Sequence, residues 1–516
     1  MALDRKYDAI VVGGGHNGLV AASYLARAGK KVVLLEAESE LGGATTSVRP
    51  FPEFDARLSR YSYLVSLLPD QIVADLGVNF KTLERSIASY TPYSNKSEGS
   101  DGGLLISQNW DERTAQSFQE LTGSSAEGLA WQDFYNEIAE VAKRIAPSML
   151  QPLKSAHSLK EEIGLPQSWS YLMEQPIGEV IRDRFSDDLV RGVVLTDGLI
   201  GTFVSADDLQ ANRCFLYHLI GNGTGQWRVP QGGMGALVTE LKRVALALGV
   251  EILVGARVSK IDSDSSGVSV KTLAGQIFTA KDLLFAAAPQ TLAKIRGEEE
   301  PQSLEGSQMK INMLLSRLPR LKSGIDPKLA FAGTFHVNES YSQLERAYNS
   351  AQSGKIPTDL PLEMYCHTLT DQSILSPELR DKGYQTITLF GLHTPASLFD
   401  QSPESVKAAA KQAALESLNQ YLLDPIESVL AVCQDGSLAI EAKSPLDLED
   451  EIGLPRGNIF HRDLDFPFID SSGADLIWGS ETADPHIYLA GAGARRGGGV
   501  SGIAGHNAAM AVLAND

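Results

Sequence analysis

The first forty residues of the chain have the order of parts found in a strand–turn–helix–strand unit that binds a dinucleotide. A short apolar run leads into Gly13, Gly15 and Gly18, which fit the G-x-G-x-x-G pattern. A helical stretch and a second apolar run follow, and that run ends at Glu36. A glycine turn without a ligand does not need this whole arrangement, so the sequence favours a bound dinucleotide.

Each residue of this motif has a physical role. Gly13 permits the tight turn after the strand, Gly15 lets a pyrophosphate approach the backbone, and Gly18 lets the helix pack close to the sheet. The start of the helix offers free N–H groups and the positive end of its dipole to phosphate. Glu36 can accept hydrogen bonds from ribose hydroxyls, and its charge would repel a 2′-phosphate.

A second glycine turn, at Gly42 and Gly43, follows Glu36 within a few residues. A nicotinamide dehydrogenase usually continues into another strand–helix–strand unit at this point. In flavoproteins, the chain turns here and runs under the FAD diphosphate toward the isoalloxazine ring. The second turn therefore favours FAD, and a plain loop is the alternative for this segment.

The end of the chain supplies another glycine-rich segment. A strand-like run enters a turn at Gly491 and Gly493, and a stretch with Gly499 and Ser501 leads into a helix that reaches Met510. The N-terminus of that helix would face the pyrimidine edge of a flavin and stabilise negative charge there on reduction. The alternative is a loop that caps a terminal helix, and the N-terminal motif favours the first interpretation.

On these residues the chain resembles the phytoene desaturase-like family of FAD-dependent oxidoreductases. Within that family it is most similar to the phytoene-dehydrogenase-like branch that includes pyridine nucleotide-disulfide oxidoreductase domain-containing protein 2. The matching segments are 11–18, 41–44, 230–237, 457–461 and 491–507. They extend from the first strand to the last helix, so the resemblance covers essentially the whole chain. A redox Cys-x-x-Cys pair, which the branch name suggests, does not occur in this sequence.

The resemblance implies an α/β fold with a Rossmann-like FAD-binding domain of the glutathione-reductase and amine-oxidase type and an interleaved α+β substrate domain. The FAD-binding domain is expected at 1–75, 228–295 and 470–516, and the substrate-binding domain at 76–227 and 296–469. The length of 516 residues agrees with more than one lobe.

Apolar spacing within the expected substrate domain predicts a helix at 126–146. The apolar segments 199–204 and 215–220 are interpreted as core, with a tunnel for an apolar substrate as the alternative. The remaining elements expected here are strands at 311–315 and 384–390 and a helix at 405–422.

The resemblance also implies individual cofactor contacts, among them Val258, whose backbone is expected to hold the adenine. The full set of expected cofactor contacts is Gly13, Gly15, His16, Asn17, Gly18, Glu36, Ala37, Gly42, Gly43, Ala44, Thr45, Val258, Gly491, Gly493, Gly499, Val500 and Ser501. The FAD is expected to be non-covalent, because no cysteine lies near the C-terminal motif.

Two residues are candidates for catalysis. Lys310 occupies a strand position like that of the lysine that holds a water near flavin N5 in amine oxidases, and an exposed strand lysine is the alternative. His461 matches a family motif close to the C-terminal cofactor segment. It would reach the substrate or the flavin, or else serve as a structural histidine bonded to backbone. The sequence indicates no metal site.

Arg495 and Arg496 follow the C-terminal turn, where carotenoid desaturases typically have Thr-His-Pro. Their cations are candidates to hold the FAD diphosphate or an acidic group of the substrate, and a surface charge is the alternative for at least one of them. This departure from the family pattern weakens the assignment to carotenoid substrates.

The net charge of −19 argues against nucleic acid and against electrostatic docking on anionic lipid. Cys214, Cys366 and Cys433 have neither metal spacing nor the pattern of a disulfide framework. No apolar run is long enough to span a membrane, and the first strand begins too early to leave room for a signal peptide. A cytoplasmic protein is expected, with at most weak peripheral contact with a membrane.

Together these features predict an FAD-dependent oxidoreductase that desaturates an apolar, isoprenoid or carotenoid-like substrate by hydride transfer to flavin. A second dinucleotide motif in the right context is missing, so oxygen or a quinone is the expected electron acceptor. Three alternatives stay open. They are an amine-oxidase-like flavoprotein, a redox-neutral isomerase, and a weakly catalytic flavin-bound partner protein.

Overall fold

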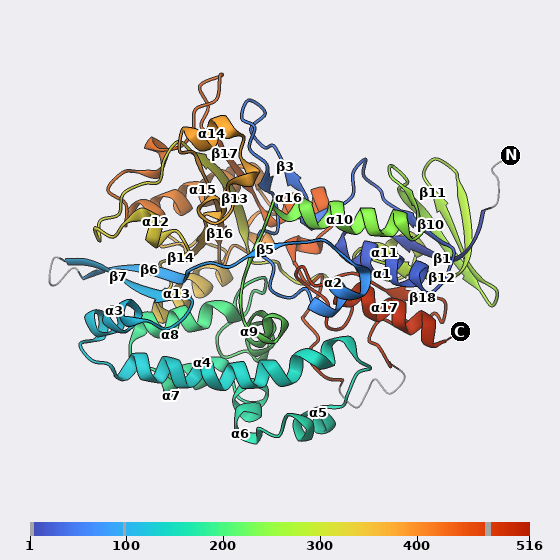
Figure 1. Ribbon diagram of the computed structural model, residues 1–516, viewed down its shortest axis with the longest axis horizontal. Helices are drawn as coiled ribbons and strands as arrows, with labels where there is room; N and C mark the ends of the chain where they lie inside the picture. Colours follow the sequence, from blue (N-terminus) through green and yellow to red (C-terminus); the bar gives the residue numbers. More distant parts are fainter. Residues whose placement is uncertain (1–4, 96–99, 470–475, 516) are drawn as a thin grey trace.

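The computed structural model describes residues 5–95, 100–469 and 476–515, and in these ranges the chain forms two large sheets and a helical lobe (Figure 1). Each large sheet has seven strands. The first sheet lies near both ends of the chain, and the second lies on the other side of the molecule next to the helical lobe (Figure 1). The α/β class expected from the sequence is confirmed.

The first sheet is built around the N-terminal strand. Its order is β10-β11-β12-β1-β2-β9, and β18 pairs with the end of β12. Strands β9, β2, β1, β12 and β18 run parallel, while β10 and β11 extend the sheet in antiparallel fashion. The strands are β1 (Arg5–Val12), β2 (Val32–Leu35), β9 (Glu251–Leu253), β10 (Val258–Asp264), β11 (Gly267–Thr272), β12 (Ile277–Phe285) and β18 (Ile487–Leu489).

Both faces of this sheet are buried, which explains why its central strands are continuous apolar runs. Ala9 and Val11 of β1 point to a core that they share with the helices α1 (His16–Arg27), α10 (Met234–Ala247) and α17 (Ile503–Ala514). Their neighbours on the other face join a separate core formed with β10, β11 and β12. Helices α1 and α17, from opposite ends of the sequence, lie side by side (Figure 1).

The second sheet has the order β17-β13-β16-β15-β14-β6-β7. Its neighbouring strands are antiparallel except for the parallel pair β14 and β6. One face is apolar and packs against α15 (Pro403–Asn419). The strands are β6 (Ile87–Asn95), β7 (Ser100–Ser107), β13 (Met309–Leu315), β14 (Thr334–Val337), β15 (Leu362–Tyr365), β16 (Gln385–Gly391) and β17 (Ile440–Lys443).

The helical lobe has its own apolar core, which includes Trp131, Phe134, Ile138 and Val141 on one face of α4. The segments expected as core or tunnel also contribute to it, since Leu199 and Phe215 are fully buried there. The helices are α3 (Glu112–Thr122), α4 (Ala126–Ile145), α5 (Ala156–Ile163), α6 (Pro166–Trp169), α7 (Ile177–Arg184), α8 (Asp188–Leu195) and α9 (Leu209–Ile220). Across the described ranges, no helix is both long enough and apolar enough to cross a membrane.

Short elements connect the lobes. Two small antiparallel pairs, β3 with β4 and β5 with β8, lie between the large sheets. The remaining elements are β3 (Ser47–Val48), β4 (Leu58–Ser59), β5 (Thr82–Leu83), β8 (Val229–Pro230), α2 (Asp70–Leu76), α11 (Pro289–Arg296), α12 (Pro327–Ala330), α13 (Tyr341–Gln352), α14 (Pro377–Asp381) and α16 (Pro445–Ile452). The strands and helices expected at 126–146, 311–315, 384–390 and 405–422 are all present, with ends shifted by a few residues. The domain boundaries themselves stay a prediction, and residues 470–475 at one of them lie outside the described ranges.

Candidate cofactor and active site

The two N-terminal glycine turns meet at the carboxyl end of β1. The N–H of Gly42 donates to the carbonyl of Gly14 at 3.0 Å, and Gly15 and Gly42 form an isolated bridge. Glu36 holds the same turn, because one carboxylate oxygen accepts from the N–H of Gly14 at 2.6 Å and the other from the N–H of Glu38 at 2.8 Å. A carboxylate has further lone pairs, so Glu36 can still accept from a ribose hydroxyl.

The glycines of these turns differ in the space that is available to an added Cβ. A Cβ on Gly18 would lie 1.9 Å from the carbonyl oxygen of Gly13, so this glycine is required for helix packing. In contrast, a Cβ on Gly15 would meet nothing closer than 3.8 Å, and the same distance applies to Gly43. Close packing at Gly18 and open space at Gly15 and Gly43 are what a pyrophosphate that approaches the backbone requires.

The start of α1 is buried, and no side chain among the described residues caps it. A buried helix start without a partner leaves N–H groups unsatisfied, which is rare unless a ligand binds there. Helix α10 shows the contrast, because its first N–H groups donate to the hydroxyls of Ser47 and Ser59 at 2.9 and 3.0 Å. The donor set at α1 therefore fits the anionic diphosphate of FAD.

The C-terminal segment closes over the same place. The ring of His16 bonds to the backbone of Gly499, and burial lowers the pKa of His16 to about 4, so the ring is neutral at pH 7. Its Nε2 has no hydrogen-bond partner in the described ranges. Further along, α17 packs on α1 so closely that a Cβ on Gly505 would lie 2.0 Å from the carbonyl oxygen of Asn17. The predicted meeting of the two terminal motifs is thus present.

The other predicted cofactor contacts lie near these turns. Val258 begins β10, two residues after Ala256, whose N–H donates to the carbonyl of Glu36 at 2.7 Å. Thr45 donates its hydroxyl to the carbonyl of Gly42 at 2.6 Å. Ser501 is fully buried in the C-terminal segment. The places of the rest are as follows: Ala37 directly after Glu36, Ala44 in a 3-10 turn at Gly43–Thr45, Gly491 against Ala286, Gly493 against Pro289, and Val500 buried.

Lys310 lies on β13, on the face of the second sheet opposite the α15 core. It is only 1% exposed, and its Nζ has no hydrogen-bond partner among the residues described. The amine lies 4.4 Å from the ring centroid of Tyr63 and 4.1 Å from that of Phe390. Burial lowers the pKa of Lys310 well below its usual value, which favours the neutral amine. The alternative of an exposed strand lysine is therefore wrong.

Lys310 belongs to a row of directly opposed residues that crosses the second sheet. In register, Lys443 of β17 pairs with Lys310, Lys310 with Phe390 of β16, Phe390 with Glu363 of β15, and Glu363 with His336 of β14. Directly opposed residues project from the same face of a sheet. The row therefore places a lysine, an aromatic ring, a carboxyl group and an imidazole on one buried face.

The acidic end of the row is partly paired. His336 and Glu339 share a hydrogen bond of 2.5 Å, and the hydroxyl of Thr196 in the helical lobe donates to the same carboxylate at 2.9 Å. Glu363 is buried, and burial raises its pKa to about 8. Asp197, beside Thr196, has its pKa raised to about 7, again by burial. The face of the second sheet that carries this row therefore faces the helical lobe.

Aromatic rings gather around Lys310. The ring centroid of Tyr63 lies 4.4 Å from Tyr365, 4.8 Å from Phe390 and 5.7 Å from His367. We call Tyr63, Tyr365, Phe390 and His367 the ring cluster. Sequence reasoning missed it, because its members come from three separate segments and no spacing along the chain signals their meeting.

His461 lies beside the C-terminal turn, as the motif predicted. Its backbone has a positive φ of 63°, and its carbonyl accepts from the side chain of Gln290 at 2.9 Å. A Cβ on Gly493 would lie 3.4 Å from the Cβ of His461. Burial lowers the pKa of His461 to about 4, and its Nδ1 has no partner in the described part of the chain. The ring of His461 is a neutral group near the cofactor segment, and its role in catalysis stays a prediction.

The two arginines after the C-terminal turn are used by the protein itself. Arg496 is 1% exposed and donates to the carbonyls of Ser148, Gln151 and Trp478 at 2.6 to 2.9 Å. Its surface-charge alternative is wrong, and its terminal N–H groups hold the helical lobe to the C-terminal turn. Arg495 pairs with Asp465 at 2.9 Å.

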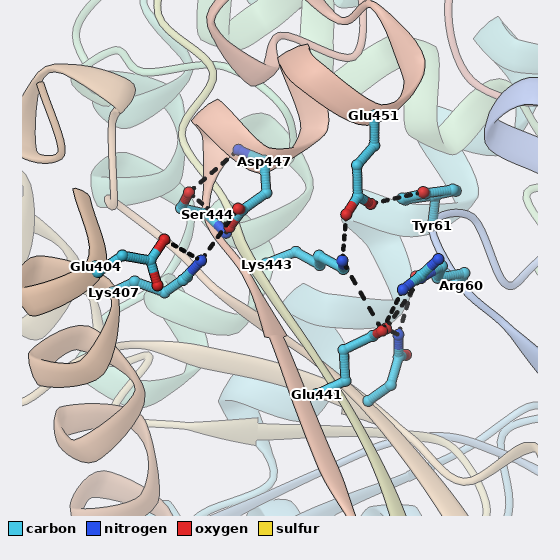
Figure 2. A network of polar contacts seen from close by, with 10 residues as sticks. Arg60, Tyr61, Glu404, Lys407, Glu441, Lys443, Ser444, Asp447 and Glu451 are labelled. Atoms are coloured by element: carbon cyan, nitrogen blue, oxygen red, sulfur yellow. Dashed lines mark hydrogen bonds and ion pairs between the residues drawn. The ribbon is translucent and has the colours of Figure 1, made fainter. Parts of the chain in front are cut away.

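A polar network anchors β17, the edge strand of the second sheet that pairs with β13 (Figure 2). Arg60 pairs with Glu441 of β17, and its carbonyl accepts from Asn312 of β13 at 3.0 Å. Lys443 pairs with Glu451 of α16. The carboxylate of Glu451 also accepts a hydrogen bond from the hydroxyl of Tyr61 at 2.8 Å. The network fixes the segment that carries the ring cluster's Tyr63 against β13 and β17. Within the described ranges, no group of side chains has the make-up of a metal site.

Two family models match the chain in agreement with this geometry. The model of an NAD(P)-binding Rossmann-like domain matches residues 11–71, and that of flavin containing amine oxidoreductases matches residues 116–314. The fold is similar over its whole length to a solved structure of a putrescine oxidase variant, with a TM-score of 0.59 and 18% identity over 100% of both chains. The fold, the glycine turns and these models define the class of protein, an FAD-dependent oxidoreductase of the amine oxidase and phytoene desaturase superfamily.

Relatives along most or all of the chain agree with this class. An uncharacterised protein of Mycobacterium tuberculosis is 44% identical over 529 residues, which cover 99% of this chain and 98% of that protein. Pyridine nucleotide-disulfide oxidoreductase domain-containing protein 2 of Rattus norvegicus is 28% identical over 99% of this chain and 94% of its own length. Prolycopene isomerase of Daucus carota is 27% identical over 67% of this chain and 57% of its own. The chain belongs to the same family as the mycobacterial protein, and the family models and relatives together identify it as an FAD-dependent oxidoreductase.

Proposed function

We propose that the protein removes two hydrogens from an apolar, isoprenoid-like substrate, with Lys310 as the residue nearest the chemistry. Bound FAD supplies the two-electron acceptor for a hydride from carbon. The observation that carries the proposal is the buried, unpaired amine of Lys310 within the ring cluster. The apolar core of the helical lobe beside this face suits a substrate with few polar groups.

The formation of a double bond requires a base as well as a hydride acceptor, because a proton leaves the neighbouring carbon. A neutral amine is such a base, and burial favours this form of Lys310 because it lowers the pKa of the amine well below its usual value. The ring cluster orients the amine and excludes water from it. Electrons leave the protein to oxygen or a quinone in this proposal, since the chain has no second dinucleotide motif.

The substrate class rests on two kinds of support. The buried surroundings of Lys310 favour an apolar molecule, and prolycopene isomerase, a relative over two thirds of this chain, is named for an isoprenoid substrate. The departure at Arg495 and Arg496 from the carotenoid desaturase pattern argues for an isoprenoid other than phytoene.

A second candidate is oxidation of an amine. Two observations favour it, namely the match to flavin containing amine oxidoreductases and the aromatic rings around Lys310. Rings of this kind suit an amine, which they attract through their negative faces. The nearby carboxyl groups of Glu363 and Asp197 would add to that attraction in their ionised forms.

The experiment that separates the candidates is anaerobic titration of the purified holoprotein while the visible absorbance of the flavin is recorded. Limonene, a carotene, putrescine and cyclohexylamine are added separately, and dithionite serves as the control for full reduction. Bleaching by a terpenoid supports the first proposal, and bleaching by an amine supports the second. A terpenoid whose mass is unchanged while its double bonds move indicates isomerisation. If only dithionite bleaches the flavin, both candidates fail and a weakly catalytic partner protein is favoured.

A further inference from the structure

Arg85 is a buried cation that forms no ion pair with any of the described residues. It lies between β5 and β6, where the chain passes into the second sheet, and it is 9% exposed. One terminal nitrogen donates weakly to the hydroxyl of Thr334 at 3.3 Å, and Nε has no partner in the described ranges. The guanidinium lies 5.6 Å from the ring centroid of Tyr365. Within the described ranges, the guanidinium of Arg85 therefore faces the ring cluster with one weak hydrogen bond and a buried Nε that has no partner.

The carboxyl groups of this region do not neutralise Arg85. Glu339 is bonded to His336 and Thr196. Glu363 forms no ion pair within the part of the chain that the structure describes, and burial raises its pKa to about 8, which favours the uncharged acid at pH 7. The pKa of Arg85 is lowered to about 10 by burial, so the guanidinium stays charged. An unbalanced buried cation is unfavourable unless an anion joins it.

His367, a member of the ring cluster, provides a second buried nitrogen without a partner in the described ranges. It is buried, and its Nε2 has no partner among the described residues. Its ring stacks on Tyr63 at 5.7 Å between centroids. Burial lowers the pKa of His367 to about 3, so its ring is neutral at pH 7. Arg85 faces the ring of Tyr365, and the rings of Tyr365 and His367 both pack on Tyr63, so Arg85 and His367 border the same ring cluster.

We propose that Arg85 and His367 bind the carboxylate of an otherwise apolar, monoanionic substrate, whose hydrocarbon part extends over the ring cluster toward Lys310. A guanidinium matches the planar geometry of a carboxylate and can donate two hydrogen bonds to it. A diphosphate carries more charge than one permanent cation can balance in this buried place. This inference rests on the proposed function and adds a substrate class to it, an isoprenoid acid in place of a hydrocarbon.

The test compares two ligands that differ only in the head group, geranic acid and geraniol, by calorimetric titration of the holoprotein. We expect geranate to bind at least about tenfold more tightly than geraniol, the margin of a charge-assisted hydrogen bond. Arg85→Met should weaken geranate binding by about ten- to a hundredfold and leave geraniol within about twofold, while Arg85→Lys should keep part of the preference. Equal affinities, no binding of geranate, or an equal loss for both ligands in Arg85→Met overturns the proposal.

A rival role for Arg85 is to balance an ionised Glu363 inside the protein. In that case Arg85→Met lowers the melting temperature, and Glu363→Gln in the same chain restores it. Under the proposal, Glu363→Gln leaves the preference for geranate intact or strengthens it, because a competing acid is removed. Calorimetric titration and thermal unfolding distinguish the two roles of Arg85, and neither measurement depends on turnover.

Failure of this inference is distinguishable from failure of the proposed function. If geraniol or limonene bleaches the flavin and geranate shows no preference, the dehydrogenation stands and the carboxylate site falls. If geranate binds through Arg85 but no terpenoid bleaches the flavin, the site stands and the dehydrogenation falls.

Discussion

Lys310 and Glu363 lie on the same row of the second sheet, with only Phe390 between them. Both are buried, and burial shifts their pKa values in opposite directions, down for the amine and up for the carboxyl group. Both groups are therefore biased toward their uncharged forms at neutral pH. This pairing gives one face of the sheet a base and an acid at a separation of two strand spacings, about 10 Å.

Replacement of Lys310 tests its role as the base. Lys310→Met should slow reduction of the flavin by the substrate by about 10²–10⁴-fold, the usual contribution of a positioned acid or base. The content of bound FAD should stay the same, since no predicted cofactor contact involves this side chain. Rapid-mixing absorbance under anaerobic conditions gives the rate. An unchanged rate in Lys310→Met would remove Lys310 from the mechanism.

Glu363 makes stability depend on pH. Its pKa is 4.5 in the unfolded chain and about 8 in the folded protein. Between these values the folded state holds the proton more tightly, so its contribution is fully present below about pH 4.5 and is lost as the pH rises to about 8. Wild type should therefore lose stability from pH 5 to pH 8 relative to Glu363→Gln. Urea unfolding at both pH values gives the free energy of unfolding of each protein. The same change from pH 5 to pH 8 in wild type and Glu363→Gln would contradict the assignment.

Two glycines of the first turn should respond differently to the same substitution. Gly15 has an ordinary φ of −71°, and a Cβ there has 3.8 Å of clearance, so Gly15→Ala should fold normally. The added methyl occupies the approach of the diphosphate, and FAD affinity should fall by at least about tenfold, or 1.4 kcal/mol. In Gly18→Ala the Cβ would collide with a backbone oxygen at 1.9 Å, so stability itself should fall. Equilibrium FAD titration and thermal unfolding separate the two effects.

Arg496 should matter for stability more than its neighbour. Its three bonds to backbone carbonyls join the helical lobe to the C-terminal turn. Arg496→Met removes three charge-assisted hydrogen bonds, one of them buried and two part-buried, at a cost of about 3 kcal/mol or more. Arg495→Met is the matched control and should cost about 1 kcal/mol or less, because its ion pair with Asp465 is partly exposed. Similar losses in both variants would show that the carbonyl contacts do not stabilise the protein.

The N-terminal motif was predictable because its parts are local. The strand, the turn at Gly13 and the helix follow one another, and each is specified by neighbouring residues. The meeting of Gly15 with Gly42 was also within reach, since a short segment separates them. The strand that carries Lys310 was predicted, but its burial was not, because an alternating pattern does not say which face of a sheet is covered.

The row from Lys443 to His336 could not be predicted from the sequence. Its register is set by the pairing of five strands that are far apart in the chain, and a shift of one residue would turn each side chain to the other face. Arg85 and Tyr63 lie in connecting segments without periodicity, so nothing in the sequence marked them. The sites that sequence reasoning missed are those made by long-range packing.

The most direct test of the account is anaerobic reduction of the bound flavin by an apolar terpenoid, measured side by side for wild type and Lys310→Met. The account predicts that the visible flavin absorbance of wild type bleaches and that the variant, with the same FAD content, bleaches at least about a hundredfold more slowly. Flavin that is bleached by dithionite but by no terpenoid, or that bleaches equally fast in both proteins, would contradict it.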